Sequence, residues 1–364
     1  MKTFTKFCAA LLPHEVTYLL QVQQFEDVDR LNILKAIDRN LGSSAPDFDP
    51  KIDKRKYSHL KNWIEKRLAE IDVDMSLRWL LSLEEAIRTD QITAKQEKQL
   101  LRSISKWDAS SFYFVKWYEV LNVFREDLLI RLRYDEVEIL DQVLADNKKP
   151  YERSIETDRE IQKFTREIVE QYKDLHGETK KHIKSLTATF KDDMLDGYNR
   201  FKAFVRLIFI GFNYRDFDFL KPHFDLFDEM LQSGWGYSKR ILLNYYSNRL
   251  LLHSRFGEYE EAEYYGYLSI KVVNQDYLMY LNNLAAILLR NGKYEEAFSI
   301  LQEGSKNAKE STNHHNKIGY VAFYVETLNR MGRFLNAENY AAVFLRLYEE
   351  KIFKYRWHVF FTTY

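Results

Sequence analysis

The chain contains few of the residues that turn or cross-link a polypeptide. Its 364 residues include 12 glycines, 5 prolines and one cysteine, Cys8. An all-β chain needs a turn about every ten residues, so this scarcity of glycine and proline excludes an all-β fold. With a single cysteine, neither an intramolecular disulfide nor a metal cluster held by thiolates can form.

Charge of one sign and long apolar runs are also missing. The 54 basic and 54 acidic residues give a formal net charge of zero, so no bulk attraction to nucleic acid or to an anionic membrane follows. No apolar run approaches the roughly 18 residues of a membrane span. The short apolar stretch near the N-terminus soon becomes an amphipathic pattern, which is not typical of a signal peptide, and we expect a cytoplasmic protein.

The motifs by which common enzymes are recognised are missing as well. The sequence has no P-loop, no glycine-rich dinucleotide fingerprint, no His-Glu-x-x-His and no nucleophile elbow. No histidine spacing is typical of a metal site. We therefore expect a non-enzymatic protein with no catalytic residues, no metal and no cofactor.

Apolar and aromatic residues that pack helices are abundant instead. Hydrophobic residues make up 46% of the chain and aromatic residues 15%, and apolar positions recur at spacings of three and four, which predicts an all-α fold. The pattern predicts one helix over 14–40, a break at 146–150, and one or two long exposed helices over 151–196, broken near Gly177. A coiled-coil pairing of the last region is the alternative to a solvated face.

Two helix starts carry capping signals. Thr93 is followed three residues later by Gln96, which resembles a capping box. Ser110 or Ser111 is predicted to cap the next helix, which is rich in aromatic residues.

A short pattern, Arg-x-Gly-x-[Tyr/Phe]-x-x-Ala, occurs three times between helical patterns. Its glycines are Gly257, Gly292 and Gly332, which are 35 and 40 residues apart. Glycine ends a helix without a side-chain clash because it adopts a left-handed conformation. The alanine five residues later lets the second helix lie close to the first. A helix-turn-helix unit of this period is typical of a solenoid.

These residues resemble the tetratricopeptide repeat family. The middle repeat follows that family's order of large and small residues with Leu281, Leu284, Ala285, Leu288, Gly292, Tyr294, Ala297, Leu301 and Gly304. The first and third repeats depart at Arg249 and Phe344, the closing proline is absent, and the 40-residue step exceeds the usual ~34 residues. The resemblance covers about residues 237–350 and implies a right-handed helical-repeat solenoid.

We divide the chain into two regions on this basis. Residues 1–196 are interpreted as an irregular helical N-terminal region, with eroded repeats as one possibility, and residues 197–364 as the repeats. Asn213 and Tyr214 lie between two helical patterns, and one interpretation is a degenerate repeat ahead of the three clear ones. Residues 352–364 are predicted to form a helix packed on the helix that contains Phe344, because water would not tolerate so many large apolar side chains.

The resemblance also implies a ligand groove lined by the first helix of each repeat. Carried over to this chain, the candidate ligand-binding residues are Asn248, Arg255, Asn282, Asn283, Arg290, Glu326, Asn329 and Arg330. Asparagines there can hydrogen-bond an extended peptide, and arginines can attract acidic groups. Alternatively, the arginines interact with helix C-termini and the asparagines fill ordinary polar positions.

The sequence thus favours a protein- or peptide-binding scaffold or adaptor whose partner it does not identify. Ser247, Asn282 and Ala322 stand where one subgroup of the family carries its clamp residues, so a chaperone C-terminal peptide is not the expected ligand. The alternative is a helical-repeat protein that binds nucleic acid or is regulatory, since pentatricopeptide repeats have a similar period. The unequal steps and the neutral charge count against nucleic acid. No membrane partner is expected, and no pattern indicates the oligomeric state.

Overall fold

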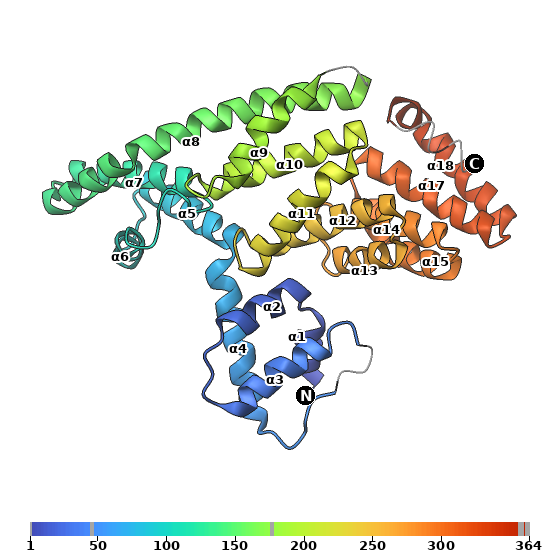
Figure 1. Cartoon of the computed structure of the whole chain (residues 1–364), viewed down its shortest axis with the longest axis horizontal. Coiled ribbons are helices and arrows are strands. Elements are labelled where there is room, and N and C mark those ends of the chain that lie inside the picture. The colour runs from blue at the N-terminus through green and yellow to red at the C-terminus, as the bar shows by residue number, and fades with distance from the viewer. Residues whose placement is uncertain (1, 44–46, 175–177, 356–359, 361–364) are drawn as a thin grey trace. The chain divides into compact units, whose positions relative to one another are not determined.

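The computed structural model describes residues 2–43, 47–174, 178–355 and 360 (Figure 1). Within these ranges every regular element is a helix, so the predicted all-α class is confirmed. None of the described helices combines the length and the hydropathy needed to cross a membrane.

The helices form two compact units, which we describe separately. Unit 1 comprises residues 1–12, 41–46 and 239–364, and unit 2 comprises residues 13–40 and 47–238. The boundary predicted after residue 196 therefore lies inside unit 2. The helix that follows it packs on the two helices that precede it.

Unit 2 contains ten α-helices and one 3-10 helix among its described residues. They are α2 (Pro13–Val22), α3 (Val28–Arg39), α4 (Lys54–Ile71), α5 (Val73–Arg88), α6 (Ala94–Ser103), α7 (Phe114–Ile130), α8 (Tyr134–Asp174), η1 (Thr179–His182), α9 (Ile183–Lys191), α10 (Gly197–Tyr214) and α11 (Phe217–Gln232). The pairs α7–α8 and α10–α11 are helical hairpins, and α10 also packs on α8 and α9. Gly177 lies outside the described residues, so the break predicted near it is not described.

The prediction of one helix over 14–40 is wrong. The segment is split into α2 and α3, because Asp27 starts a new helix as an N-cap. Its carboxylate accepts a hydrogen bond from the backbone N–H of Asp29 at 3.0 Å, which satisfies one of the unpaired donors at the start of α3.

The break predicted at 146–150 is also wrong, because α8 runs through Pro150 as one helix of 41 residues. Tyr118 of α7 contacts α8 on both sides of the proline. Its hydroxyl donates to the Leu144 carbonyl at 3.2 Å, and its ring stacks on Tyr151 at a centroid distance of 4.2 Å. Such packing offsets the cost of about 3 kcal/mol or more that proline imposes inside a helix.

One capping prediction is confirmed and the other is wrong. The Thr93 hydroxyl accepts from the backbone N–H of Gln96 at 3.3 Å, and the Gln96 side chain accepts from the backbone N–H of Thr93 at 2.9 Å, which is a capping box at the start of α6. No serine caps α7, which begins at Phe114 without a side-chain cap. The Ser111 hydroxyl accepts from the Asp108 backbone instead.

Unit 1 contains α1 (Lys2–Ala9) and the part of the chain with the glycine motifs. Its further helices are α12 (Lys239–Phe256), α13 (Tyr259–Ser269), α14 (Tyr277–Arg290), α15 (Tyr294–Glu303), α16 (Ser305–Glu310), α17 (His314–Arg330) and α18 (Phe334–Tyr355). The three motifs lie at the turns of the packed pairs α12–α13, α14–α15 and α17–α18. The short α16 follows α15 and accounts for the longer second step between glycines.

The glycines at these turns have the predicted left-handed conformation. Their φ angles are +75° at Gly257, +74° at Gly292 and +72° at Gly332. After Gly292, the backbone N–H of Lys293 donates to the Leu288 carbonyl at 2.9 Å, which closes the end of α14.

Small residues are buried where the second helix of each pair meets its neighbours. Ala262 and Ala297 are fully buried and Ala337 is 2% exposed, as expected for close approach. At Gly304 an added Cβ would lie 2.2 Å from Leu281 Cδ2. Substituting any of these positions with a larger residue would force the helices apart.

The C-terminal prediction is only partly covered by the structure. α18 bends at Tyr348, whose φ of −129° is not helical, and ends at Tyr355. Residues 356–359 and 361–364 lie outside the described residues. Phe360 is buried, and its ring centroid lies 6.0 Å from that of Phe344, so this side chain packs on the helix that the sequence indicated.

Candidate functional site

The asparagines predicted to contact a ligand lie on α12 and α14, where they bond within the fold. Asn282 is only 4% exposed, and its Nδ2 donates to the Asn316 carbonyl of α17 at 2.9 Å. Asn283 Nδ2 donates to the Ser247 hydroxyl of α12 at 3.0 Å. Asn248 Nδ2 donates to the carbonyl of Asn244, one turn earlier, at 2.9 Å. These amide N–H groups therefore bond within and between first helices of the pairs.

Two of the arginines predicted to bind a ligand also form hydrogen bonds within unit 1. Arg290 donates to the Ser254 hydroxyl at 3.1 Å. Arg330 Nε donates to the Glu326 carboxylate at 2.8 Å within α17. Arg255 is exposed and Asn329 is half-buried at the ends of α12 and α17. The structure brings the eight residues onto three successive first helices, but much of their hydrogen-bonding capacity is used there.

A surface groove lies over the helix pairs α14–α15 and α17–α18, and we call it the α18 groove. Its volume is about 770 Å³. α15, α17 and α18 line it with Phe298, Gln302, Tyr324, Leu328, Asn336, Asn339, Tyr340, Val343, Phe344 and Leu347, the turn between α17 and α18 adds Arg333, and α16 adds Lys309. None of these twelve residues was among those predicted to bind a ligand.

Large apolar side chains of α18 are exposed in this groove. Leu347 is 70% exposed, Val343 is 57% exposed and Tyr340 is 40% exposed. Phe344 is half-buried. Gathered on one face, exposed side chains of this size mark surfaces that bind other molecules.

The polar side chains of the groove have one sign of charge. Lys309 and Arg333 line it with no carboxylate among the described residues, and an adjoining hollow of about 190 Å³ adds Lys317. The hollow shares Lys309, Tyr340 and Phe344 with the groove, so the two form one surface. This surface therefore presents three cations beside apolar side chains.

The aromatic rings of this surface already face one another or a cation. Phe298 stacks on Tyr324 at a centroid distance of 5.7 Å, and the guanidinium of Arg333 lies 4.8 Å from the Phe298 ring. Phe344 and Tyr348 stack at 4.5 Å. These contacts leave fewer ring faces for a ligand, whereas the aliphatic side chains of α18 remain uncovered.

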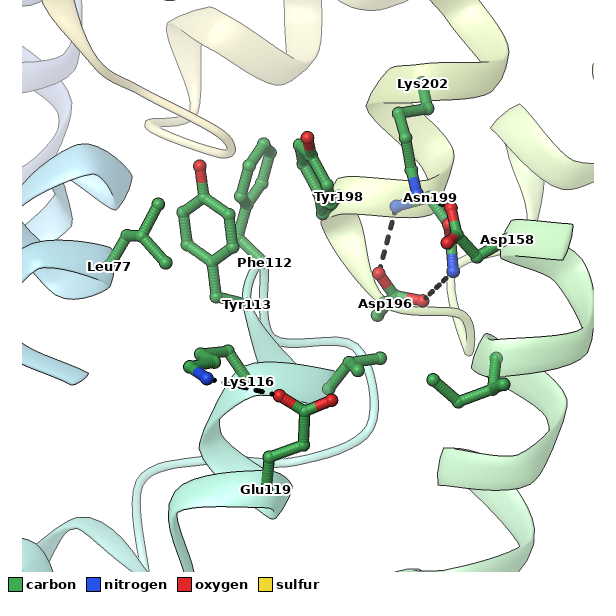
Figure 2. A pocket seen from close by; sticks show the side chains of 12 residues that line it. Leu77, Phe112, Tyr113, Lys116, Glu119, Asp158, Asp196, Tyr198, Asn199 and Lys202 are labelled. Atoms are coloured by element: carbon green, nitrogen blue, oxygen red, sulfur yellow. Dashed lines mark hydrogen bonds and ion pairs between the residues drawn. The ribbon is translucent and has the colours of Figure 1, made fainter. Parts of the chain in front are cut away.

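Unit 2 contains a different kind of site, a pocket of about 280 Å³ between α5, α7, α8 and α10. Figure 2 shows the rings of Phe112, Tyr113 and Tyr198 side by side along one edge. The Tyr113 and Tyr198 rings have centroids 5.3 Å apart. The ion pairs of the pocket lie on the helices around this aromatic edge.

The charged side chains of this pocket are paired within unit 2. Lys116 Nζ lies 2.5 Å from Glu84 and 3.3 Å from Glu119, and its hydrogen bond lowers the pKa of the Glu84 carboxyl. Lys202 forms an ion pair with Asp158. A charged ligand would have to break such pairs to bind here.

Asp196 and Asn199 form the buried polar corner of the same pocket (Figure 2). Asp196 is the N-cap of α10 and accepts from the backbone N–H of Asn199 at 2.9 Å and from its Nδ2 at 2.8 Å. Burial raises the pKa of the Asp196 carboxyl. The Asn199 Nδ2 also donates to the Ser154 carbonyl of α8. These contacts join α10 to α8, which is a role in the fold.

Sequence reasoning missed both the α18 groove and the unit 2 pocket. The pocket is assembled from four helices far apart in the sequence and leaves no local pattern. The groove left one signal, since Tyr340, Val343, Phe344 and Leu347 have the spacing that places side chains on one face of α18. Such an apolar face is typical of a helix that packs on a neighbour, so the pattern predicts packing and not exposure.

Comparisons of the chain with protein-family models, curated proteins and solved structures found no match. The case for a function therefore depends on the geometry and chemistry of the two sites.

Proposed function

We propose that this protein is a non-enzymatic helical-repeat scaffold that binds a segment of another protein in the α18 groove. The observation that carries the proposal is the row of exposed apolar side chains along α18, with Leu347 at 70% and Val343 at 57% exposure. Protein interfaces have apolar centres with polar rims. The lining of the groove likewise combines apolar residues with the polar Gln302 and Asn339.

The packing of the helix pairs supports a repeat scaffold that resembles the tetratricopeptide family. α14 packs on both α12 and α13, and α17 packs on both α14 and α15. Each pair thus contacts the next, as in solenoid proteins. The left-handed glycines and the buried alanines support the same interpretation.

The proposal places the ligand elsewhere than the resemblance implied. The first-helix residues Asn283 and Arg290 donate to Ser247 and Ser254 of the preceding first helix. We propose that this row holds successive repeats in register. The α18 groove, built mainly from α15, α17 and α18, is the proposed binding surface.

A selection from random displayed peptides of about 18 residues, long enough for a marginal helix, tests the proposal. The full chain is the bait, and Leu347→Glu and Leu335→Glu are the comparison variants. Leu335 is 69% exposed on α18 but does not line the groove, so it is matched in residue type, helix and exposure.

Selected peptides should lose binding to Leu347→Glu and keep it with Leu335→Glu, because only the first substitution places a carboxylate in the groove. A selection that enriches no sequence would contradict the proposal. Enriched peptides that bind both variants equally would move the binding site away from the α18 groove.

A further inference from the structure

Four residues form a continuous seam along the groove side of α18. Asn336, Tyr340, Val343 and Leu347 all line the groove, at spacings of four, three and four residues. Alternating steps of three and four are the spacing at which one helix packs along another. The seam spans about 17 Å at roughly 1.5 Å per residue, or about three helical turns. A helix of that length is therefore the occupant that fits the seam.

The groove residues of α15 and α17 repeat the helical spacing. Phe298 and Gln302, one turn apart on α15, line the groove, and so do Tyr324 and Leu328, one turn apart on α17. An amphipathic helix binds such a groove by placing its apolar stripe between two helices. The α18 bend at Tyr348 lies directly after the seam.

The charges of the surface select among such helices. Arg333 lies at the start of the seam in sequence, and Lys309 and Lys317 border the hollow that contains Tyr348. Among the residues that the structure describes, no carboxylate lines either the groove or the hollow. Complementary charge favours a partner with acidic residues beside its apolar stripe and disfavours a basic one.

We infer that the α18 groove binds an acidic amphipathic helix of another protein, packed along the seam 336–347. The inference rests on the proposed function and names the chemistry of its partner. Exposed Val343 and Leu347 contact the apolar stripe of that helix, and Arg333, Lys309 and Lys317 pair with carboxylates on its flanks.

The same cations and rings could suggest single-stranded nucleic acid, but the ring geometry favours a helix. Bases bind such proteins by stacking on free aromatic faces. Here Phe298 stacks on Tyr324 and lies 4.8 Å from the Arg333 guanidinium, and Phe344 stacks on Tyr348. The most exposed large apolar side chains of the groove, Leu347 and Val343, are aliphatic.

Three synthetic peptides of about 18 residues test the inference, because this length supports a marginal helix. The first carries leucines at four-three-four spacing with flanking glutamates. The second has lysine in place of every glutamate, and the third contains the residues of the first in an order that destroys the stripe. Binding to the full chain is followed by fluorescence anisotropy, together with binding of a uridine oligonucleotide.

The acidic amphipathic peptide should bind, and the lysine and reordered peptides should bind about tenfold more weakly or not at all. Lys309→Glu combined with Arg333→Glu should lower the affinity for the acidic peptide about tenfold and raise the affinity for the lysine peptide. The matched control combines Lys306→Glu with Arg346→Glu, two exposed cations of α16 and α18 outside the lining, and should leave the preference unchanged. Added salt should weaken the acidic peptide.

Several outcomes would overturn the inference, and they separate it from the proposed function. The acidic and lysine peptides could bind equally, and Leu347→Glu could abolish both interactions. That result would support a helix-binding groove but reject an acidic partner. Binding of the oligonucleotide alone, lost with the double cation variant, would make the partner nucleic acid. Self-association in analytical ultracentrifugation that disappears in Leu347→Glu would make the occupant a second copy. Binding of no peptide would reject the acidic helix, while the display selection would still test the wider proposal.

Discussion

Both units end helices with the same backbone turn, but unit 2 builds three of these turns without glycine. In unit 1 the left-handed residues of the helix pairs are glycines, with φ between +72° and +75°. In unit 2, Gly234 takes this conformation after α11 with φ of +87°, but the turns that follow α5, α7 and α10 have Asp90, Leu132 and Arg215, with φ of 54°, 60° and 54°. Only glycine adopts this conformation without a steric cost, which is about 1–2 kcal/mol for other residues.

The hydrogen bonds of these turns match closely. At Gly292, the glycine N–H donates to Leu289 at 3.2 Å, and the following N–H donates to Leu288 at 2.9 Å. At Leu132, the corresponding N–H groups donate to Leu129 at 3.1 Å and to Leu128 at 3.0 Å. The geometry of the helix end thus determines the turn, while the residue type determines whether a sequence pattern reveals it.

The small residue that lets two helices approach also lies on different helices in the two units, on the second helix of the α14–α15 pair and on the first helix of the α10–α11 pair. Five residues after Gly292 the second helix has Ala297, but five residues after Arg215 the second helix has the fully buried Leu220. The room for this leucine comes from Gly211 on the first helix, where an added Cβ would lie 2.4 Å from Leu220 Cγ. The two hairpins therefore solve the same packing problem from opposite helices.

The largest expected effect tests this exchange in the α10–α11 hairpin. Leu220→Ala should lower the free energy of unfolding by about 2–5 kcal/mol through a cavity. Gly211→Ala should cost about 1–3 kcal/mol through overpacking against Leu220. The double variant should be more stable than the sum of the two losses predicts, because the smaller residue 220 makes room for the new methyl group.

Urea unfolding followed by tryptophan fluorescence measures this coupling in unit 2, which contains Trp63, Trp79, Trp107, Trp117 and Trp235. Strict additivity of the two losses would show that Gly211 and Leu220 do not share the space.

The corresponding substitution in unit 1 should have the next largest effect. Ala297→Leu should cost about 1–3 kcal/mol, because Ala297 is fully buried and its neighbours leave no room for three more carbon atoms. Ser299→Leu, at an exposed position of the same helix, is the control. Thermal unfolding followed by far-ultraviolet circular dichroism compares them. Equal midpoints would mean that α15 does not approach its neighbours closely at Ala297.

These comparisons explain how far the sequence predicted the fold. Glycine at the left-handed turn and alanine at the close approach recur in all three hairpins of unit 1, so a pattern of residue types revealed them. In unit 2, Leu132 and Arg215 occupy the same turn without any distinguishing chemistry. Pro150 misled the prediction because the stabilising contacts of Tyr118 come from a distant part of the sequence.

The candidate site was less predictable than the fold for a similar reason. The repeat pattern predicted which residues lie on the first helices of the pairs. The hydrogen bonds of these residues to Ser247 and Ser254 depend on how neighbouring helices are spaced, which the pattern does not give. The α18 seam could be recognised as apolar, yet its exposure depends on which faces α15 and α17 leave uncovered. Whether Val343 and Leu347 are core or binding surface is a question of tertiary structure.

A smaller effect is expected from changing the turn residue in unit 1. Gly292→Val should destabilise by about 1–2 kcal/mol, because a β-branched side chain clashes in the left-handed conformation. Gly292→Asn is the matched control and should cost less, since asparagine tolerates that conformation. Thermal unfolding ranks the two variants. If valine and asparagine cost the same, the penalty would come from the loss of glycine itself and not from the φ angle.

The smallest expected effect is a gain in stability, and we expect it at the α7–α8 turn. Leu132→Gly should raise the free energy of unfolding by about 0.5–1 kcal/mol, because the steric cost removed exceeds the entropy that glycine loses on folding. Little burial is lost, since Leu132 is 67% exposed. Urea unfolding by tryptophan fluorescence detects the gain, and Leu132→Asn should give a gain of the same sign. A loss in both variants would show that the leucine side chain stabilises unit 2 by more than its strained backbone costs.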